Sequence, residues 1–438
     1  MKRAIRSALL AALAALAAAA ATASAAAELS PVEQRIVAEV KAQSAEALLL
    51  LERSVNINSG TMNPAGVRQV GALFRREFDA LGFQTRWIDM PPEMQRAGHL
   101  LATRDGGQGK RLLLLGHLDT VFEADSPVQK WDRQGDRVRG QGVNDMKGGD
   151  VALIQALRAL ARIGALDNTR IAVLFTGDEE NAGNPKSVSR RDMVELAKAS
   201  DAALGFEGTV SGRDGRATGT VGRRASSLFE LDVKGKQAHS SGIFGESAGY
   251  GAVYEAARIL DGFRQQVIEP GLTFNPGVIL GGTAIGYDET LSRGNAFGKT
   301  NVIANSVTVK GDLRYLDYAQ RDRAHAKMRE IAALSLPGTS AVVTFHDSYP
   351  PMAVTEGNLK LLALYSQASL DAGLGEVDAV PAEARGAGDV QFAAPYVDSL
   401  DGLGASGRGS HSPLEDLELA SVERAAIRTA LLVYRLTR

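Results

Sequence analysis

The chain has 438 residues, of which 45% are hydrophobic and 23% are charged, and its formal net charge is −2. This length allows two domains with a sizeable core, and the composition is ordinary for a soluble globular protein. The nearly balanced charge argues against a nucleic-acid-binding protein, which would need a basic face. Because the chain has no cysteine, disulfides are excluded, and any metal site must use His, Asp and Glu.

Residues 1–27 are predicted to form a secretory signal peptide. Lys2, Arg3 and Arg6 precede an alanine- and leucine-rich run that ends in small residues, at Ala25 or at Ala27. Its removal takes away three positive charges and leaves a formal net charge of −5. An uncleaved membrane anchor is the alternative, and no later stretch is long and apolar enough to span a bilayer. We therefore expect a periplasmic or secreted protein with no membrane attachment once the signal is cleaved.

The first elements after the signal are helices, followed by strands. Ser30, Pro31 and Glu33 form the start signal of a helix that we expect to run to about Val55, and a second helix covers 67–81. After two strands, at 84–90 and 99–104, four consecutive leucines at 112–115 predict a strand buried on both faces, as in a parallel sheet.

The buried strand at 112–115 leads into Gly116, His117 and Asp119. Side chains two apart on a strand point the same way, so an imidazole and a carboxylate emerge together where open α/β sheets place their ligands. His117 could bind a metal, with Asp119 orienting its ring. A His–Asp pair that merely caps the strand is the alternative for these two residues alone.

Four more acidic residues lie in a loop before a helix or directly after predicted strands. Asp145 lies in a Gly-rich loop before a helix at 151–163, Glu179 and Glu180 follow a strand at 170–175, and Glu207 follows a strand at 202–206. This alternation of strands and helices predicts an α/β domain with a mostly parallel sheet and helices on both faces.

The pattern changes at about residue 217. Strands at 223–233, 277–285, 302–316 and 341–347 and helices at 248–267 and 318–334 give a β-α-β-β-α-β order, typical of a ferredoxin-like domain. The α/β pattern returns after residue 350, with helices at 358–372 and 418–436. We therefore predict one domain built from 28–216 and 351–438, and an inserted domain at 217–350.

The polar residues at the strand ends form a set of two imidazoles and three carboxylates: His117, Asp145, Glu180, Glu207 and His411. This set suits two zinc ions or similar divalent metals, which can share one carboxylate when about 3.5–4 Å apart and can lower the pKa of water towards about 7. An unliganded carboxylate must then take the water's proton. The adjacent Glu179 and Glu180 offer one side chain for each task. They would repel each other without cations nearby, which favours a metal site over a solvated acidic turn.

Together these motifs resemble the dinuclear zinc peptidase family of aminoacylases, glutamate carboxypeptidases and acetylornithine deacetylases, and most closely its exported bacterial glutamate carboxypeptidases. The resemblance covers nearly the whole mature chain. The motifs that carry it are Gly116-His117-Leu118-Asp119, Gly142-x-x-Asp145-Met146-Lys147-Gly148-Gly149, Glu179-Glu180, Glu207 and Ser410-His411.

The resemblance implies a role for each residue of the set. His117 and Glu207 would complete one zinc site, Glu180 and His411 the other, and Asp145 would bridge the two ions. Asp119 would orient His117, and Glu179 would be the general base and then the general acid. The family also has a cis peptide bond after its bridging aspartate, which here is the bond between Asp145 and Met146.

In the inserted domain, which would be a lid and a dimerisation domain, the resemblance implies three further roles. His239 would reach the active site of the partner subunit in a homodimer and stabilise the oxyanion. Asn301 and Arg314 would hold a substrate's C-terminal carboxylate, for which the forked donors of arginine are well suited. Each of the three could also be an ordinary loop or edge residue.

The chain departs from the family pattern at two places. The glutamate-specific members carry an arginine just after the last strand of the insert, and residues 344–350 contain none. The sequence therefore does not identify which side chain the enzyme prefers on the released amino acid. The usual Gly-Gly-Thr-Asp-type loop reads Gly386-Ala387-Gly388-Asp389. His99 and His325 match no motif and are interpreted as structural or surface residues. His346 is a candidate substrate contact.

We thus predict an exported zinc-dependent carboxypeptidase that acts on small peptides. A deacylase acting on N-acyl amino acids is the alternative within the same family. A non-catalytic periplasmic binding protein is a third reading. Glu179 argues against it, since binding alone needs no unliganded base.

Overall fold

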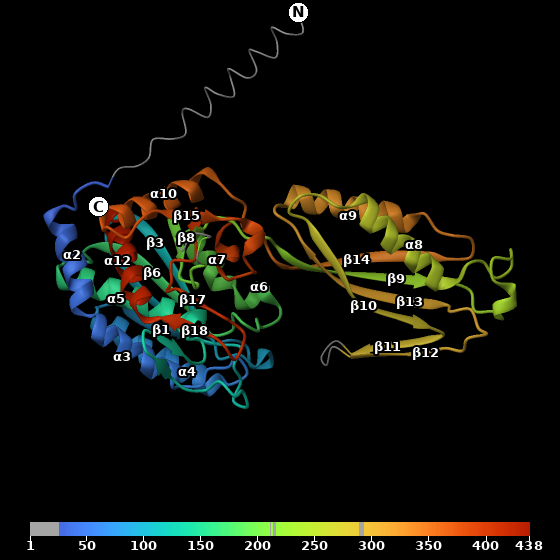
Figure 1. Ribbon diagram of the computed structural model, residues 1–438, viewed down its shortest axis with the longest axis horizontal. Helices are drawn as coiled ribbons and strands as arrows, with labels where there is room; N and C mark the ends of the chain where they lie inside the picture. Colours follow the sequence, from blue (N-terminus) through green and yellow to red (C-terminus); the bar gives the residue numbers. More distant parts are fainter. Residues whose placement is uncertain (1–25, 211, 213–215, 289–292) are drawn as a thin grey trace, which may run out of the picture.

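The computed structural model describes residues 26–210, 212, 216–288 and 293–438. Nearly all of the predicted signal peptide, 1–25 of 1–27, lies outside the described residues. The described chain forms a larger and a smaller lobe, joined by extended segments (Figure 1). Within it, no helix combines the length and the apolar character that crossing a bilayer would require.

The larger lobe is built on a six-stranded sheet in the order β1-β2-β6-β3-β7-β16. β3 pairs in parallel with β6 and β7, and β7 with β16, whereas β1 and β2 are antiparallel to their neighbours. The sheet is therefore mostly parallel, as predicted. Its strands are β1 (Gln84–Ile88), β2 (His99–Asp105), β3 (Gln108–His117), β6 (Thr169–Thr176), β7 (Ala202–Gly205) and β16 (Ser399–Leu400).

The leucines of β3 show why this strand is apolar on both sides. Leu112 and Leu114 pack into one core, and Leu113 and Leu115 pack into another on the opposite face. The prediction of a strand buried on both faces is confirmed. The first core includes residues of α2 (Pro31–Ala42), α3 (Ser44–Val55), α4 (Pro64–Ala80), α5 (Gly148–Arg162), α10 (Glu356–Asp371) and α12 (Leu419–Leu436). The second includes residues of α7 (Arg191–Lys198) and α11 (Val390–Ala393), and the single turn α6 (Lys186–Ser189) precedes α7.

Two further details concern the larger lobe. The helix expected to run from Pro31 to Val55 is divided at Gln43 into α2 and α3, and its predicted capping box, Ser30 with Glu33, is present. Short helical turns complete the lobe at η1 (Pro92–Met94), η2 (Val143–Lys147) and η4 (Ala382–Ala384).

The smaller lobe is an antiparallel sheet in the order β10-β13-β9-β14, packed against α8 and α9. Its elements follow in the order β-α-β-β-α-β, as predicted. A two-stranded sheet between β10 and β13 was not predicted. The elements are β9 (Ser226–Lys234), η3 (Ser240–Gly242), α8 (Gly251–Gln266), β10 (Thr273–Gly282), β11 (Ala284–Asp288), β12 (Arg293–Phe297), β13 (Ser306–Arg314), α9 (Tyr318–Ala333) and β14 (Ser340–Tyr349).

Two small sheets connect distant parts of the larger lobe. β8 (Ala217–Thr220), which lies inside the range predicted for the insert, pairs in parallel with β15 (Val377–Val380). The domain limits 217 and 350 stay predictions. The other sheet runs in the order β17-β18-β5-β4 and places the loop at 409–415 beside η2. Its strands are β4 (Asp132–Gln134), β5 (Arg137–Arg139), β17 (Gly407–Arg408) and β18 (Asp416–Glu418).

Candidate active site

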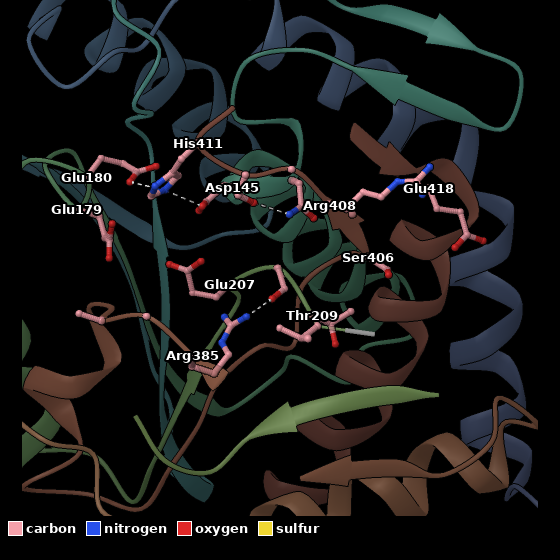
Figure 2. A pocket seen from close by; sticks show the side chains of 18 of the residues that line it. Asp145, Glu179, Glu180, Glu207, Thr209, Arg385, Ser406, Arg408, His411 and Glu418 are labelled. Atoms are coloured by element: carbon pink, nitrogen blue, oxygen red, sulfur yellow. Dashed lines mark hydrogen bonds and ion pairs between the residues drawn. The ribbon is translucent and has the colours of Figure 1, made fainter. Parts of the chain in front are cut away.

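The polar residues predicted at the strand ends converge at one edge of the large sheet. Figure 2 shows four of them, Asp145, Glu180, Glu207 and His411. His117 ends β3, Glu180 follows β6, and Glu207 follows β7. Asp145 lies in η2, immediately before α5, and His411 lies in the loop between β17 and β18. The start of α5 closely approaches the residue after β7, because a Cβ on Gly149 would lie 1.9 Å from the carbonyl oxygen of Phe206.

Asp145 lies between the two imidazoles. Its Oδ1 is 3.3 Å from Nε2 of His117, and its Oδ2 is 3.2 Å from Nε2 of His411. Each imidazole also faces a second carboxylate. Oε1 of Glu207 lies 3.5 Å from His117 Nε2, and Oε2 of Glu180 lies 3.1 Å from His411 Nε2. The five residues thus form two groups of nitrogen and oxygen donors that share one carboxylate.

These donors fit a pair of divalent metal ions. The second oxygen of Glu180, Oε1, is buried and has no hydrogen-bond partner among the described residues, so it can accept a metal. Burial raises the pKa of Glu180 to about 7, and it also raises the pKa of Glu207. So many buried carboxylates repel one another unless cations compensate them, and two imidazoles with three carboxylates suit zinc or a similar metal.

Asp119 makes a different contact from the one predicted. The backbone carbonyl oxygen of Asp119, 3.0 Å away, is the partner of His117 Nδ1, whereas the carboxylate is 3.6 Å from that nitrogen. The carboxylate instead accepts hydrogen bonds from the backbone N–H groups of Glu179 and Glu180, at 3.0 and 3.1 Å, and from the Thr61 hydroxyl, at 2.6 Å. Asp119 therefore fixes both the imidazole and the turn that carries the two glutamates.

Glu179 lies beside the group of donors around His117. A carboxylate oxygen of Glu179 and donor atoms of His117 and Glu207 all lie within 4.8 Å of one another. Burial and the neighbouring carboxylates raise the pKa of Glu179 well above its usual value, although His117 opposes this shift. The backbone carbonyl of Glu179 accepts a hydrogen bond from the Tyr349 hydroxyl, at 3.2 Å. A carboxylate with this raised basicity can accept a proton next to the donor cluster.

Several residues that support the site were not identified from the sequence. Oε1 of Glu415 accepts hydrogen bonds from the backbone N–H groups of Asn144 and Asp145, at 2.9 and 3.2 Å. These bonds hold the segment before the bond between Asp145 and Met146, which is cis, as the resemblance implied. Lys147 is buried, which lowers its pKa to about 7, and it donates to the carbonyl of Ile57.

A second supporting network lies behind the turn that carries Glu179. Arg190 donates to Asp178 and to Asp389, at 2.6 Å each, and all three side chains are buried. Asp389 is the last residue of the loop that departs from the family pattern. His99 accepts a hydrogen bond from the Gly177 N–H and is buried, so it is a structural residue, as interpreted from the sequence.

The residues predicted in the smaller lobe lie outside the cleft at the site. This cleft has a volume of about 760 Å³. Its lining residues do not include His239, Asn301 or Arg314. His239 is exposed, and the backbone N–H of Ser240 next to it donates to the Asn301 carbonyl. Arg314 pairs with Asp312 at 2.9 Å. Their predicted roles require a movement of the smaller lobe or a second copy of the chain.

The two other histidines of the smaller lobe do not line the cleft either. His325 is stacked on Phe345 with 3.6 Å between the ring centroids, and burial lowers its pKa to about 4. This fits the structural role that we assigned to it. His346 is exposed on β14, so its contact with a substrate stays a prediction.

Comparison with known proteins gives consistent results. Residues 113–435 match the family described as Peptidase family M20/M25/M40. Carboxypeptidase G2 of Pseudomonas sp. (strain RS-16) is 28% identical over 87% of this chain and 87% of its own length. Succinyl-diaminopimelate desuccinylase of Nitrosomonas eutropha is 27% identical over 77% of this chain and 85% of its own. A dinuclear metal-binding peptidase of Bacillus subtilis has a similar structure, with a TM-score of 0.62, 15% identity and coverage of 91% of this chain and 99% of its own.

The contacts of Asp119 predict an effect on metal binding. Asp119→Ala removes the acceptor that orients Glu180, so we expect the dissociation constant for zinc to rise about 10- to 100-fold. Competition with a fluorescent zinc chelator would measure it. Asp89→Ala is a matched control, because the Asp89 side chain is 72% exposed and pairs with Arg68 on the surface. Equal zinc affinity in both variants would contradict this role.

The electrostatics of His411 predict proton release on metal binding. Hydrogen bonds to Asp145 and Glu180 raise the pKa of His411 to about 11 in the metal-free protein, so its ring is protonated at neutral pH. A metal needs the neutral ring, so affinity should fall as the pH falls, with at least one proton released per chain at pH 7. Calorimetry in buffers of different ionisation enthalpy would count the protons. His411→Ala should release fewer, and an unchanged count would refute the assignment.

Proposed function

The chain belongs to the peptidase family M20/M25/M40 and is a metallohydrolase, and on that premise we propose that it is an exported, zinc-dependent carboxypeptidase. It would hydrolyse the amide bond next to a free C-terminal carboxylate and release an amino acid. The observation that carries the proposal is the position of Asp145, whose two oxygens face the imidazoles of His117 and His411. Glu179 lies beside this cluster and supplies a further carboxylate. A binding protein would not need this extra, half-buried carboxylate.

The residues of the site divide the work of hydrolysis. Two divalent ions held by His117, Asp145, Glu180, Glu207 and His411 would polarise the substrate carbonyl and lower the pKa of water. Glu179 takes the proton of the attacking water on its carboxylate and then gives it to the nitrogen of the leaving amino acid. Because Asp119 holds the N–H groups of both glutamates, the two neighbouring side chains keep separate positions for these separate tasks.

A deacylase is the second candidate, and the comparisons give each candidate some support. The similarity to carboxypeptidase G2 favours cleavage next to a C-terminal amino acid, whereas the similarity to succinyl-diaminopimelate desuccinylase favours removal of an acyl group. Both reactions break an amide bond in the same kind of site. Kinetics of the zinc-loaded protein on dipeptides and on N-acyl amino acids would separate them.

Glu179 gives the test of the mechanism. Glu179→Gln should lower turnover about 10²- to 10⁴-fold, because a general base of that strength is lost, while the protein still binds two metal ions per chain. Glu418→Gln is a matched control in the same cleft, because Glu418 is already paired with Arg424. Steady-state kinetics and metal analysis of the three proteins would check this. Normal turnover by Glu179→Gln would exclude the proposed base.

We also propose a homodimer formed through the smaller lobe, because His239 and Asn301 lie outside the cleft of their own chain. Each active site would then use the His239 of the other chain. Subunits carrying Glu179→Ala and subunits carrying His239→Ala should each be inactive, and mixing them should restore activity at one site in each mixed dimer. Light scattering would give the mass. An active monomer, or mixing without recovery, would rule out the shared site.

Export is the remaining part of the proposal and rests on the sequence of residues 1–27. Full-length protein expressed in a Gram-negative host should be recovered from the periplasm or the medium, with Ala26 or Glu28 as its first residue. Replacing Lys2, Arg3 and Arg6 by glutamine should leave uncleaved protein inside the cell. Fractionation and N-terminal mass spectrometry would show this. Cytoplasmic protein that keeps its first residues would disprove export.

A further inference from the structure

Four arginines line the cleft, and three of them have carboxylate partners. Arg137 pairs with Asp416, and Arg408 lies 3.3 Å from the same carboxylate. Arg223 donates to Asp401 from Nε, at 2.9 Å. The fourth, Arg385, has no carboxylate within ion-pair distance in the part of the chain that the structure describes.

Arg385 nevertheless has a defined position. Its Nη1 donates to the carbonyl oxygen of Gly208, at 3.1 Å, and Gly208 follows the predicted metal ligand Glu207. Its Nε is buried and has no hydrogen-bond partner among the described residues. Figure 2 shows the guanidinium beside Glu207, on the side of the cleft that faces the cluster. The guanidinium therefore offers donors close to the donor cluster.

The loop after Arg385 is held by a buried ion pair. Arg223, which is paired with Asp401, also donates from Nη1 to the carbonyl oxygen of Gly386, at 2.7 Å. The loop lies close to this guanidinium, because a Cβ on Gly388 would come within 3.1 Å of the Arg223 Cζ. The backbone next to Arg385 is thus fixed, and its guanidinium is held by the Gly208 carbonyl. Little side-chain entropy is therefore lost when Arg385 binds a ligand.

The surroundings of Arg385 favour an anion. Burial and the charge of Arg223 lower the pKa of Arg385, yet an arginine side chain keeps its proton in proteins. The carboxylates of Asp145 and Glu207 attract it at a distance, but metal ions at those carboxylates would cancel this attraction. The half-buried guanidinium has a buried Nε without a hydrogen-bond partner among the described residues, and a carboxylate is the ligand that its fork matches best.

We propose that Arg385 binds the free carboxylate next to the scissile amide, so that the larger lobe anchors the substrate by itself. The inference rests on the proposed function for its substrate class. It gives Arg385 the task that the resemblance implied for Arg314, which is paired with Asp312 outside the cleft. Substrates would then be selected for a negative charge close to the cluster.

The test compares N-benzoyl-L-alanine with N-benzoyl-L-alaninamide on the zinc-loaded, full-length protein. Arg385→Gln should lower kcat/KM for the carboxylate about 10- to 100-fold, as expected for a lost charge-assisted hydrogen bond. For the amide, kcat/KM should stay within about threefold, so the preference for the carboxylate falls. Arg385→Lys should recover part of this preference, because it keeps the charge without the fork.

Two further variants serve as comparisons. Arg408→Gln removes the same charge from the same cleft, but its arginine already has Asp416 as a partner, so the preference should remain. Arg314→Gln tests the competing assignment, in which the smaller lobe holds the carboxylate. If Arg314→Gln loses the preference and Arg385→Gln does not, the inference is overturned. The same holds if Arg385→Gln slows both substrates equally or lowers the zinc content, because Arg385 would then only balance the charge of the cluster.

A binding measurement separates this inference from the proposed function. If the wild-type protein cleaves neither compound, the carboxypeptidase and deacylase proposals lose their support, and calorimetry with the same two compounds still tests Arg385. Tighter binding of the carboxylate than of the amide, abolished in Arg385→Gln, would support the anchor. Equal binding of the two compounds by the wild-type protein would overturn it.

Discussion

The site depends on the sharing of one carboxylate between two imidazoles. Asp145 points one oxygen at His117 and the other at His411, two residues almost 300 positions apart in the chain. Although burial alone would raise its pKa, hydrogen bonds to the two rings keep the pKa of Asp145 well below its usual value. This geometry lets two cations occupy neighbouring positions, and those cations would in turn offset the repulsion among the other buried carboxylates.

The backbone around the cluster is held by a second layer of polar groups, which fix the loops that carry the site. The Asp119 carboxylate holds the two N–H groups that follow β6, and the Glu415 carboxylate holds the two that precede the cis bond in η2. Both acids bind main chain, so the ligand side chains remain free for the metals. Loss of such a supporting group typically lowers metal affinity or activity about 10- to 100-fold.

Much of this arrangement could be predicted from the sequence, because the large sheet follows from simple patterns. Four leucines in a row indicated β3, and polar residues after successive strands indicated one shared edge. The supporting contacts could not be predicted in this way. Arg190 bridges Asp178 and Asp389 across some 200 residues, and Arg385 is positioned by its hydrogen bond to Gly208. Contacts of this kind depend on the folded geometry, which no local spacing encodes. The roles implied for His239, Asn301 and Arg314 are not decided by the folded chain.

The hydrogen bond from the Tyr349 hydroxyl to the Glu179 carbonyl joins the two lobes at a sensitive point. Tyr349 is the last residue of β14 in the smaller lobe, and Glu179 carries the carboxylate next to the donor cluster. A hinge motion of the smaller lobe would therefore displace the backbone carbonyl of Glu179 and change the orientation of its carboxylate. Substrate entry and readiness for proton transfer would then be coupled through the Tyr349 hydroxyl.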